Sequence, residues 1–207
     1  MPQYKFYYFD ARGRGEPIRF IFHAANIPYE DVRISREQWP TMKKDTPMGQ
    51  IPVLEVDGKK MCQSVAIARY IARQGGLLSN DSFEMAQADM YVDGILDLFP
   101  SYQPVIRALI EGKSDVAKQE FETLKTGALK TFLDRYEGYL KANGSGYFVG
   151  KKLTWADLFI AEILDRFLTL HDKTALNGHP TLADFVKRIQ SLPSLKKYLD
   201  SRPQTAF

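Results

Sequence analysis

The sequence contains one cysteine and three histidines, which is too few for several common kinds of site. The single thiol, Cys62, cannot form an internal disulfide, and a lone thiol is typical of a reducing compartment. His23, His171 and His179 are widely spaced, so the sequence groups no set of metal ligands. We therefore expect no metal and no cofactor, and we interpret Cys62 as a small buried hydrophobic residue.

Long hydrophobic runs and a strong charge of one sign are also missing. No apolar stretch approaches the length of a membrane span, and Met1–Lys5 lacks the apolar region of a signal peptide. The net charge of +3 is small and dispersed, which argues against nucleic acid as a partner. We expect a cytoplasmic protein without nucleic-acid or membrane partners.

Strand and helix signals alternate in the first third of the chain. Asp57-Gly58 is a strong hairpin turn, Ser64 is expected as a helix N-cap, and Gly75-Gly76 ends that helix. The expected elements are a strand at 5–9, a helix at 16–25, a strand at 29–34, a polar segment at 35–48, a strand at 53–56, a strand closing at 61–63 and a helix from 64. This order predicts a four-stranded mixed sheet with three helices.

The remainder of the chain has long helical stripes and no strand signals, which indicates an all-α bundle. The expected helices span 82–111, 114–141, the segment after the capping box Thr154–Asp157, and about 181–191. Pro100 and Pro104 should bend or interrupt the first of these helices, and Pro193 and Pro203 mark a tail. We predict a domain at 1–76, a linker at 77–81 and a helical domain at 82–207.

The usual catalytic motifs are absent. Gly13-Arg14-Gly15 lacks the lysine and spacing of a P-loop, no nucleophile elbow is present, and no C-x-x-C follows the first strand. What remains at the end of that strand is Tyr8, with Arg14 opening the next helix. A phenol is neutral at pH 7, but its O–H can donate to a sulfur anion.

These residues therefore suggest that the reactive thiol belongs to a bound ligand and not to the protein. Lowering a thiol pKa from about 8.5 to about 6.5 requires about 2.7 kcal/mol. One charge-assisted hydrogen bond and a partly screened arginine can supply that amount. Strand alternation alone makes Tyr7 an equally good candidate for this role.

Several motifs together resemble the cytosolic glutathione transferases, and the resemblance runs along the whole chain. They are Tyr8-Phe9, Gly13-Arg14-Gly15-Glu16-Pro17-Ile18-Arg19, Gln50-Ile51-Pro52-Val53 and Gln63-Ser64-x-Ala66-Ile67. Trp39, Lys43, Thr154–Asp157 and Arg202–Thr205 are similar to the sigma class, in particular to nematode sigma-like enzymes. A more distant resemblance is to the haematopoietic prostaglandin D synthase. The implied fold is thioredoxin-like, followed by an all-helical domain that supplies the electrophile pocket.

The resemblance also implies roles for individual residues. Tyr8 would stabilise the thiolate of glutathione, a co-substrate, with Arg14 assisting. The Ile51-Pro52 bond would be cis, and the Ile51 backbone would pair with the cysteinyl part. The other implied glutathione contacts are Gln63 and Ser64 with the γ-glutamyl carboxylate, Trp39, Lys43 and Gln50 with the glycyl end, and Asp97 of the second subunit with the amino group. The family is dimeric, so a homodimer is expected.

The sequence departs from the prostaglandin synthase at the second-substrate pocket. Leu96-Asp97 replaces paired acids, no tryptophan occurs among Tyr102, Gln103 and Pro104, and Ala11 replaces a larger apolar residue. The residues expected to line the electrophile pocket are Ala11, Gly13, Tyr102, Ile106, Arg107, Ile160, Leu164 and Phe207.

The resemblance implies glutathione conjugation to small hydrophobic electrophiles in detoxification. Three alternatives stay open. They are a carrier of haem or other apolar molecules at the dimer cleft, a prostaglandin H to D isomerase, and a scaffold that keeps the fold without activity.

Overall fold

The computed structural model describes residues 2–205, which form two compact units. The sheet unit contains the chain up to Leu78 together with Pro193–Thr205, and the helical unit contains Ser79–Leu192. The predicted fold class, a four-stranded mixed sheet domain and an all-helical domain, is confirmed. The C-terminal segment differs from the expected boundary, because it belongs to the sheet unit and not to the helical one.

The sheet has the strand order β2-β1-β3-β4. Its strands are β1 (Tyr4–Phe9), β2 (Glu30–Ile34), β3 (Val53–Val56) and β4 (Lys59–Cys62). β1 pairs with β2 in parallel, and the other two pairs are antiparallel. The predicted hairpin turn is present, with Asp57 and Gly58 both at positive φ.

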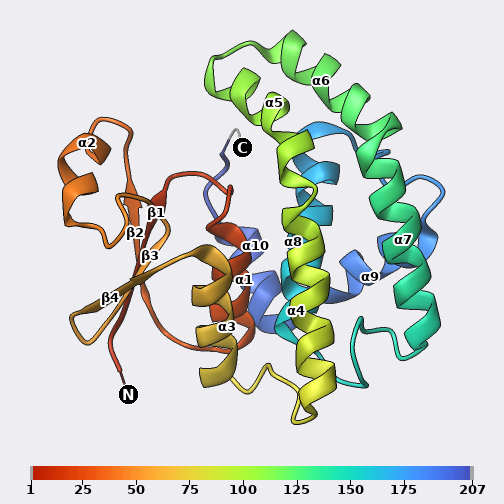
Figure 1. The fold of residues 1–207 in the computed structure, drawn as a ribbon, viewed down its shortest axis with the longest axis horizontal. Coiled ribbons are helices and arrows are strands. Elements are labelled where there is room, and N and C mark those ends of the chain that lie inside the picture. The colour runs from red at the N-terminus through yellow and green to blue at the C-terminus, as the bar shows by residue number, and fades with distance from the viewer. Residues whose placement is uncertain (1, 206–207) are drawn as a thin grey trace. The chain divides into compact units, whose positions relative to one another are not determined.

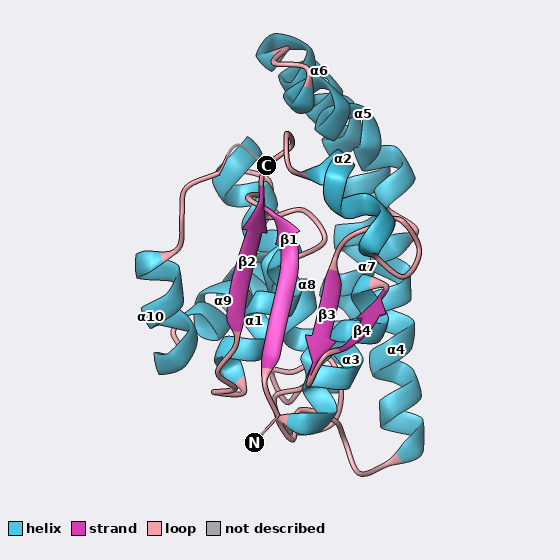
Figure 2. Cartoon of the chain, turned by 90° about the vertical axis from the view of Figure 1, so that its left-hand side faces the viewer, coloured by secondary structure: helices cyan, strands magenta, loops and turns pink. Residues whose placement is uncertain are grey.

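Helices cover both faces of the sheet. Figure 1 shows α1 (Glu16–Ala24) and α3 (Ser64–Gln74) on one side, and α2 (Trp39–Met42) on the other. In Figure 2 α2 lies in front of the sheet; a 3-10 turn, η1 (Lys43–Asp45), follows it. Because side chains alternate along β1, Tyr4, Phe6 and Tyr8 are buried on the α1 side, while Tyr7 and Phe9 point toward α2.

Two expectations in this unit were wrong. Ser64 is not the N-cap of α3: Gln63 takes that position, and Ser64 is the first helical residue, because Gln63 turns the chain with φ of 77°. The Pro193 tail is a helix, α10 (Pro193–Ser201). Its Tyr198 stacks on His23 with ring centroids 4.1 Å apart, which explains why this segment packs with α1.

The helical unit contains shorter helices than the sequence predicts. They are α4 (Ser82–Leu96), α5 (Phe99–Ile110), α6 (Ser114–Thr126), α7 (Ala128–Asn143), α8 (Trp155–Arg166) and α9 (Pro180–Gln190), with a π-helical turn, η2 (Phe167–His171), after α8. The helix expected at 114–141 breaks at Gly127, whose φ and ψ of −108° and −107° are not helical. Pro100 lies in the first turn of α5, so the predicted interruption is confirmed.

α8 is the central helix of this unit, and every one of its residues is buried. The predicted capping box is confirmed: Asp157 accepts from the Thr154 backbone N–H at 2.8 Å and from the Thr154 hydroxyl at 2.8 Å. Within residues 2–205, no helix combines the length and hydrophobicity needed to cross a bilayer. The same residues hold no group of three or more His, Cys, Asp or Glu side chains placed to bind a metal ion.

Candidate active site

The Tyr8 hydroxyl is held at the end of β1 by the loop that follows it. The backbone N–H of Arg14 donates to Tyr8 Oη at 2.8 Å, and Tyr8 is only 8% exposed. The Tyr8 oxygen therefore accepts a hydrogen bond from the backbone, and the phenol O–H is a donor in chemical terms.

Gly13 and Gly15 form a close cradle around the Tyr8 ring. A Cβ on Gly13 would lie 2.4 Å from Tyr8 Oη, and a Cβ on Gly15 would lie 2.4 Å from Tyr8 Cδ1. Gly13 also has φ of +37°, a region that side chains rarely adopt. Gly13 was expected only in the electrophile pocket, and its close approach to the Tyr8 ring was not predicted from the sequence. The G-x-G spacing beside a strand-end tyrosine is the signal that could have indicated it.

A buried arginine, Arg19, orders the same loop from α1. Its guanidinium donates to the carbonyl of Ala11 at 2.9 Å and to that of Phe9 at 3.4 Å. It also lies over the Tyr8 ring, 5.9 Å from the centroid, and pairs with Asp31 at 3.1 Å. Arg19 is fully buried and so links the loop, the ring and β2.

Glu16 neutralises this buried positive charge. It accepts from Arg19 at 3.2 Å, from Tyr198 at 2.9 Å and from Arg202 at 3.0 Å. Burial would raise the pKa of Glu16, but the charges of Arg19, Arg202 and Arg12 outweigh it and hold the pKa below its usual value. Glu16 is therefore a carboxylate at neutral pH, and α10 is tied to the residue next to Gly15.

Tyr7, the alternative to Tyr8, lies on the other face of the sheet. Its hydroxyl donates to Glu55 at 3.1 Å. Burial and the neighbouring Glu55 raise the pKa of Tyr7, so this phenol remains neutral. The glycine cradle and the backbone donor belong to Tyr8 alone of the two tyrosines.

The β-sheet register brings other expected residues beside Tyr8. Tyr7 pairs with Val53, and Val53 pairs with Cys62. The residues that follow Tyr7 and Cys62 and precede Val53 are Tyr8, Gln63 and Pro52, so these three lie near the same end of the sheet. The Ile51-Pro52 peptide is cis, as expected.

Gln63 and Ser64 occupy the start of α3. Gln63 has a positive φ of 77°, a backbone conformation that costs a non-glycine residue on the order of 1–3 kcal/mol and is concentrated at ligand sites. Ser64 is buried, and α3 has no side-chain N-cap hydrogen bond. The free N–H groups of this 11-residue helix and its dipole suit a carboxylate.

The remaining expected glutathione residues lie on or near α2. Trp39 is half-buried and packs edge-on against Phe9, with ring centroids 5.8 Å apart. Lys43 and Gln50 are exposed, as is Arg14 on the other side of the sheet. These side chains are accessible to a charged ligand.

The residues expected to line the electrophile pocket differ in how far they are exposed to solvent. Tyr102 is buried, and its hydroxyl lies 2.5 Å from Nε2 of His171, a partner that the sequence analysis missed. Ile160 and Leu164 are fully buried in α8, and their place in the electrophile pocket stays a prediction. The remaining positions are Ala11, buried; Gly13 and Ile106, half-buried; Arg107, exposed; and Phe207, outside the described residues.

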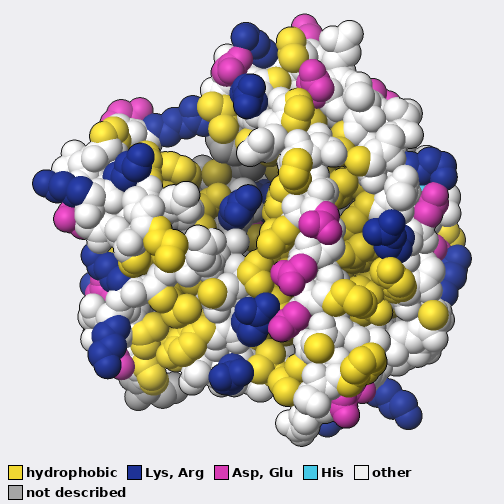
Figure 3. Space-filling model, in the orientation of Figure 1, with side chains coloured by type: hydrophobic (Ala, Val, Ile, Leu, Met, Phe, Trp, Pro, Cys, Tyr) yellow, Lys and Arg dark blue, Asp and Glu magenta, His cyan; other side chains and the backbone are white. Residues whose placement is uncertain are grey.

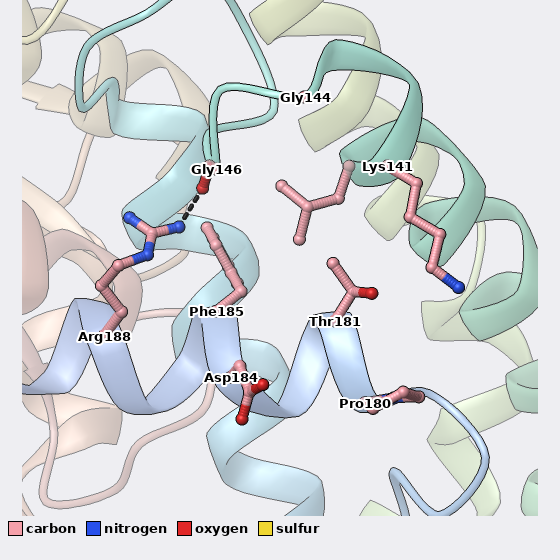
Figure 4. Close-up of a pocket in the computed structure, with 9 residues that line it drawn as sticks. Lys141, Gly144, Gly146, Pro180, Thr181, Asp184, Phe185 and Arg188 are labelled. Carbon is pink, nitrogen blue, oxygen red and sulfur yellow. Dashed lines mark hydrogen bonds between the residues drawn. The ribbon is translucent and has the colours of Figure 1, made fainter.

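A separate groove of about 440 Å³ lies between α7 and α9 and contains none of the expected glutathione residues (Figure 4). Its charged side chains are already paired. Arg188 donates to the Gly146 carbonyl, and Lys141 pairs with Glu137 at 2.8 Å. We interpret these contacts as structural.

Comparison with known proteins decides the family. Residues 4–73 match the glutathione S-transferase N-terminal domain, and residues 101–202 match the glutathione S-transferase C-terminal domain. The chain belongs to the glutathione S-transferase family. It is 40% identical to Glutathione S-transferase 1 of Ascaris suum over 207 residues, which is 100% of both chains.

Two further relatives are similar to the chain over nearly its whole length. Human hematopoietic prostaglandin D synthase is 40% identical, with 99% of each chain covered. A solved Nu-class glutathione S-transferase from Haemonchus contortus is 38% identical, covers 100% of each chain and has a TM-score of 0.85. The loop around Tyr8 lies within the N-terminal family match.

Proposed function

We propose that this glutathione S-transferase conjugates glutathione, held as a thiolate by Tyr8, to small hydrophobic electrophiles. The observation that carries the proposal is the Tyr8 hydroxyl, which accepts the Arg14 N–H at 2.8 Å beneath Gly13 and Gly15. In the proposed complex, the Tyr8 O–H would donate to the sulfur anion. Detoxification of reactive compounds is the role that this chemistry serves.

The proposed reaction needs no cofactor. The glutathione thiol loses its proton to solvent, and the Tyr8 O–H and the Arg14 side chain stabilise the sulfur anion. The sulfur then forms a bond to the electrophilic carbon, and the leaving group departs with its electron pair. A strong donor placed at the sulfur lowers the cost of forming the nucleophile.

Glutathione would bind at the end of the sheet near Tyr8, Pro52 and Gln63. The γ-glutamyl carboxylate would accept N–H bonds at the start of α3 beside Ser64, and the Ile51 backbone would pair with the cysteinyl part. Trp39, Lys43 and Gln50 would hold the glycyl end. The accessible charges on the α2 side support this orientation.

We assign the chain to the sigma-like group on the motifs around Tyr8, Trp39 and Lys43. The identity to the human prostaglandin synthase supports that assignment. Prostaglandin isomerisation is a separate activity, and the absence of a tryptophan at residues 102–104 speaks against it. Tyr102, Ile106 and Arg107 would contact the electrophile.

The protein would act as a homodimer through α4. Phe83 and Met90 on this helix are 71% and 51% exposed, which is unusual for large apolar side chains. Figure 3 shows acidic side chains in a column over α4 with hydrophobic ones beside them. A groove of about 560 Å³ between α4 and α7 is lined by Asp93, Asp97 and Arg135, so a two-fold contact could pair opposite charges. Asp97 would then reach the glutathione of the partner subunit.

Steady-state conjugation of glutathione to 1-chloro-2,4-dinitrobenzene tests the main proposal. Tyr8→Phe should lower kcat/KM by on the order of 100-fold with glutathione affinity kept, because only the thiolate loses its donor. Tyr7→Phe is the matched control and should keep full activity. Equal activity of Tyr8→Phe and the unmodified protein would refute the role of Tyr8. Low activity of both the unmodified protein and Tyr8→Phe, together with tight haem binding, would favour the alternative function as a haem carrier.

A further inference from the structure

A small cavity lies between α2 and the sheet, on the face opposite Tyr8. It encloses about 210 Å³, and its floor is formed by Tyr7, Ile34 and Val53 on three adjacent strands. Ile51 forms part of the wall, and Met42 and Thr46 close it from the α2 side. None of the residues of the Tyr8 loop lines it.

The floor and wall of the cavity are mostly apolar. Ile34 and Val53 are each 2% exposed, so the floor of the cavity reaches the core of the unit, while the exposed Asp45 and Lys60 lie at its open edge. An apolar cavity of roughly 150 Å³ is large enough to hold benzene. A volume of about 210 Å³ therefore fits one aromatic ring with a small substituent.

The polar edge of the cavity determines which substituent on a bound aromatic ring is favoured. Lys60 and Asp45 both line it, and Lys60 Nζ donates to the Asp45 carbonyl at 3.3 Å. Since the edge carries one charge of each sign, neither an anion nor a cation is favoured. A neutral hydroxyl suits both groups, because it can accept from the ammonium and donate to a carbonyl or carboxylate oxygen.

We propose that this cavity binds a neutral single-ring phenol, and that the bound ring strengthens glutathione binding. The second part rests on the proposed function. Met42 and Thr46 belong to the same segment as Trp39 and Lys43, and Ile51, whose backbone is the proposed cysteinyl contact, lines the cavity. A ring beneath this segment supports it in the position that the glycyl end of glutathione requires.

The phenol should change glutathione binding and not the chemical step. Side chains alternate along β1, so Tyr8 lies on the face of the sheet opposite Tyr7, and the backbone of Arg14 in the following loop bonds its hydroxyl. The KM for glutathione should therefore fall by about fivefold at saturating phenol, while kcat stays unchanged. Phenol is not an electrophile, so it is not consumed.

Titration of the full-length protein with phenol, followed by nuclear magnetic resonance, tests the binding site without glutathione. The signals of Ile34, Ile51 and Val53 should shift and saturate in the low-millimolar range. Val53→Phe, which fills the floor, should abolish the saturable shifts, and the milder Val53→Ile should weaken them if the larger ring prevents folding. Absence of saturable shifts at these residues, or their persistence at full strength in the filled variant, overturns the proposal.

A pair of neighbouring lysines provides the matched control. Lys60→Met keeps the apolar stem but removes the donor, and should weaken phenol binding by about fivefold. Lys59→Met, at the adjacent position of β4 outside the cavity lining, should leave it unchanged. Equal weakening in both variants would contradict the assigned site.

Kinetics with glutathione then separate the two proposals. A KM that is unchanged by bound phenol overturns the coupling. If the protein fails to bind glutathione while phenol still shifts the cavity residues, the proposed function fails and the phenol site stands.

Discussion

The cradle around Tyr8 makes a sharp prediction for Gly15→Ala. The new Cβ would lie 2.4 Å from Tyr8 Cδ1 and 2.7 Å from Cγ, whereas an ordinary contact begins at 3.4 Å. The ring must therefore move by about 1 Å. The backbone of Gly15 has φ of −88° and ψ of −33°, which alanine adopts easily, so the effect is purely steric.

A displacement of that size at a reacting group costs on the order of 100-fold in rate. We expect kcat/KM for chlorodinitrobenzene conjugation to fall by about this factor, with the overpacked site losing about 1–3 kcal/mol of stability. Glutathione affinity, measured by tryptophan fluorescence, should change little, because most of its proposed contacts lie elsewhere. Gly138→Ala is the matched control: its Cβ meets nothing within 4 Å, so activity should be unchanged.

The double variant Tyr8→Phe/Gly15→Ala identifies the cause. If Gly15→Ala acts only by moving the Tyr8 hydroxyl, the double variant should be no less active than Tyr8→Phe alone. A fully active Gly15→Ala protein, or losses that multiply in the double variant, would refute the reasoning.

Three further predictions concern stability and are measured by urea unfolding. Because the pKa of Glu16 is lowered in the folded protein, its contribution to the free energy of unfolding should be complete above the ordinary glutamate pKa of 4.5 and should be lost as the pH falls through the folded-state pKa. A free energy of unfolding that does not depend on pH would contradict this account. Tyr198→Phe removes a donor to Glu16 and should cost about 1–2 kcal/mol at pH 7. Asp157→Ala should cost at least about 3 kcal/mol because the backbone N–H groups of Phe148 and Thr154 and the Thr154 hydroxyl lose their acceptor; a loss below about 1 kcal/mol would argue against the capping box. Ile160→Val should cost about 0.5–1.5 kcal/mol and, because Ile160 is fully buried, leave the preference among electrophiles unchanged; a changed preference would support the place of Ile160 in the electrophile pocket.

Local patterns in the sequence were sufficient for most of the secondary structure. The Asp57-Gly58 turn, the strand alternation around Tyr8 and the capping box at Thr154 each depend on residues close together in the chain. The helix break at Gly127 and the helix after Pro193 were missed, although glycine and proline are the local signals for such boundaries. Ser64 was misplaced by one residue because the positive φ of Gln63 is a cost that only its surroundings can offset.

The sequence by itself determined the order of elements, the two-part architecture and a short set of candidate residues, since these follow from spacing and composition. Strand alternation left Tyr7 and Tyr8 equivalent, and the resemblance favoured Tyr8. The tertiary structure adds the physical distinction, because the Arg14 N–H, the close approach of Gly13 and Gly15 and the buried Arg19 converge on Tyr8 from separate parts of the loop and helix. The cavity beneath α2 was likewise decided by packing, because it lies where four strands and a distant segment meet without filling the space between them.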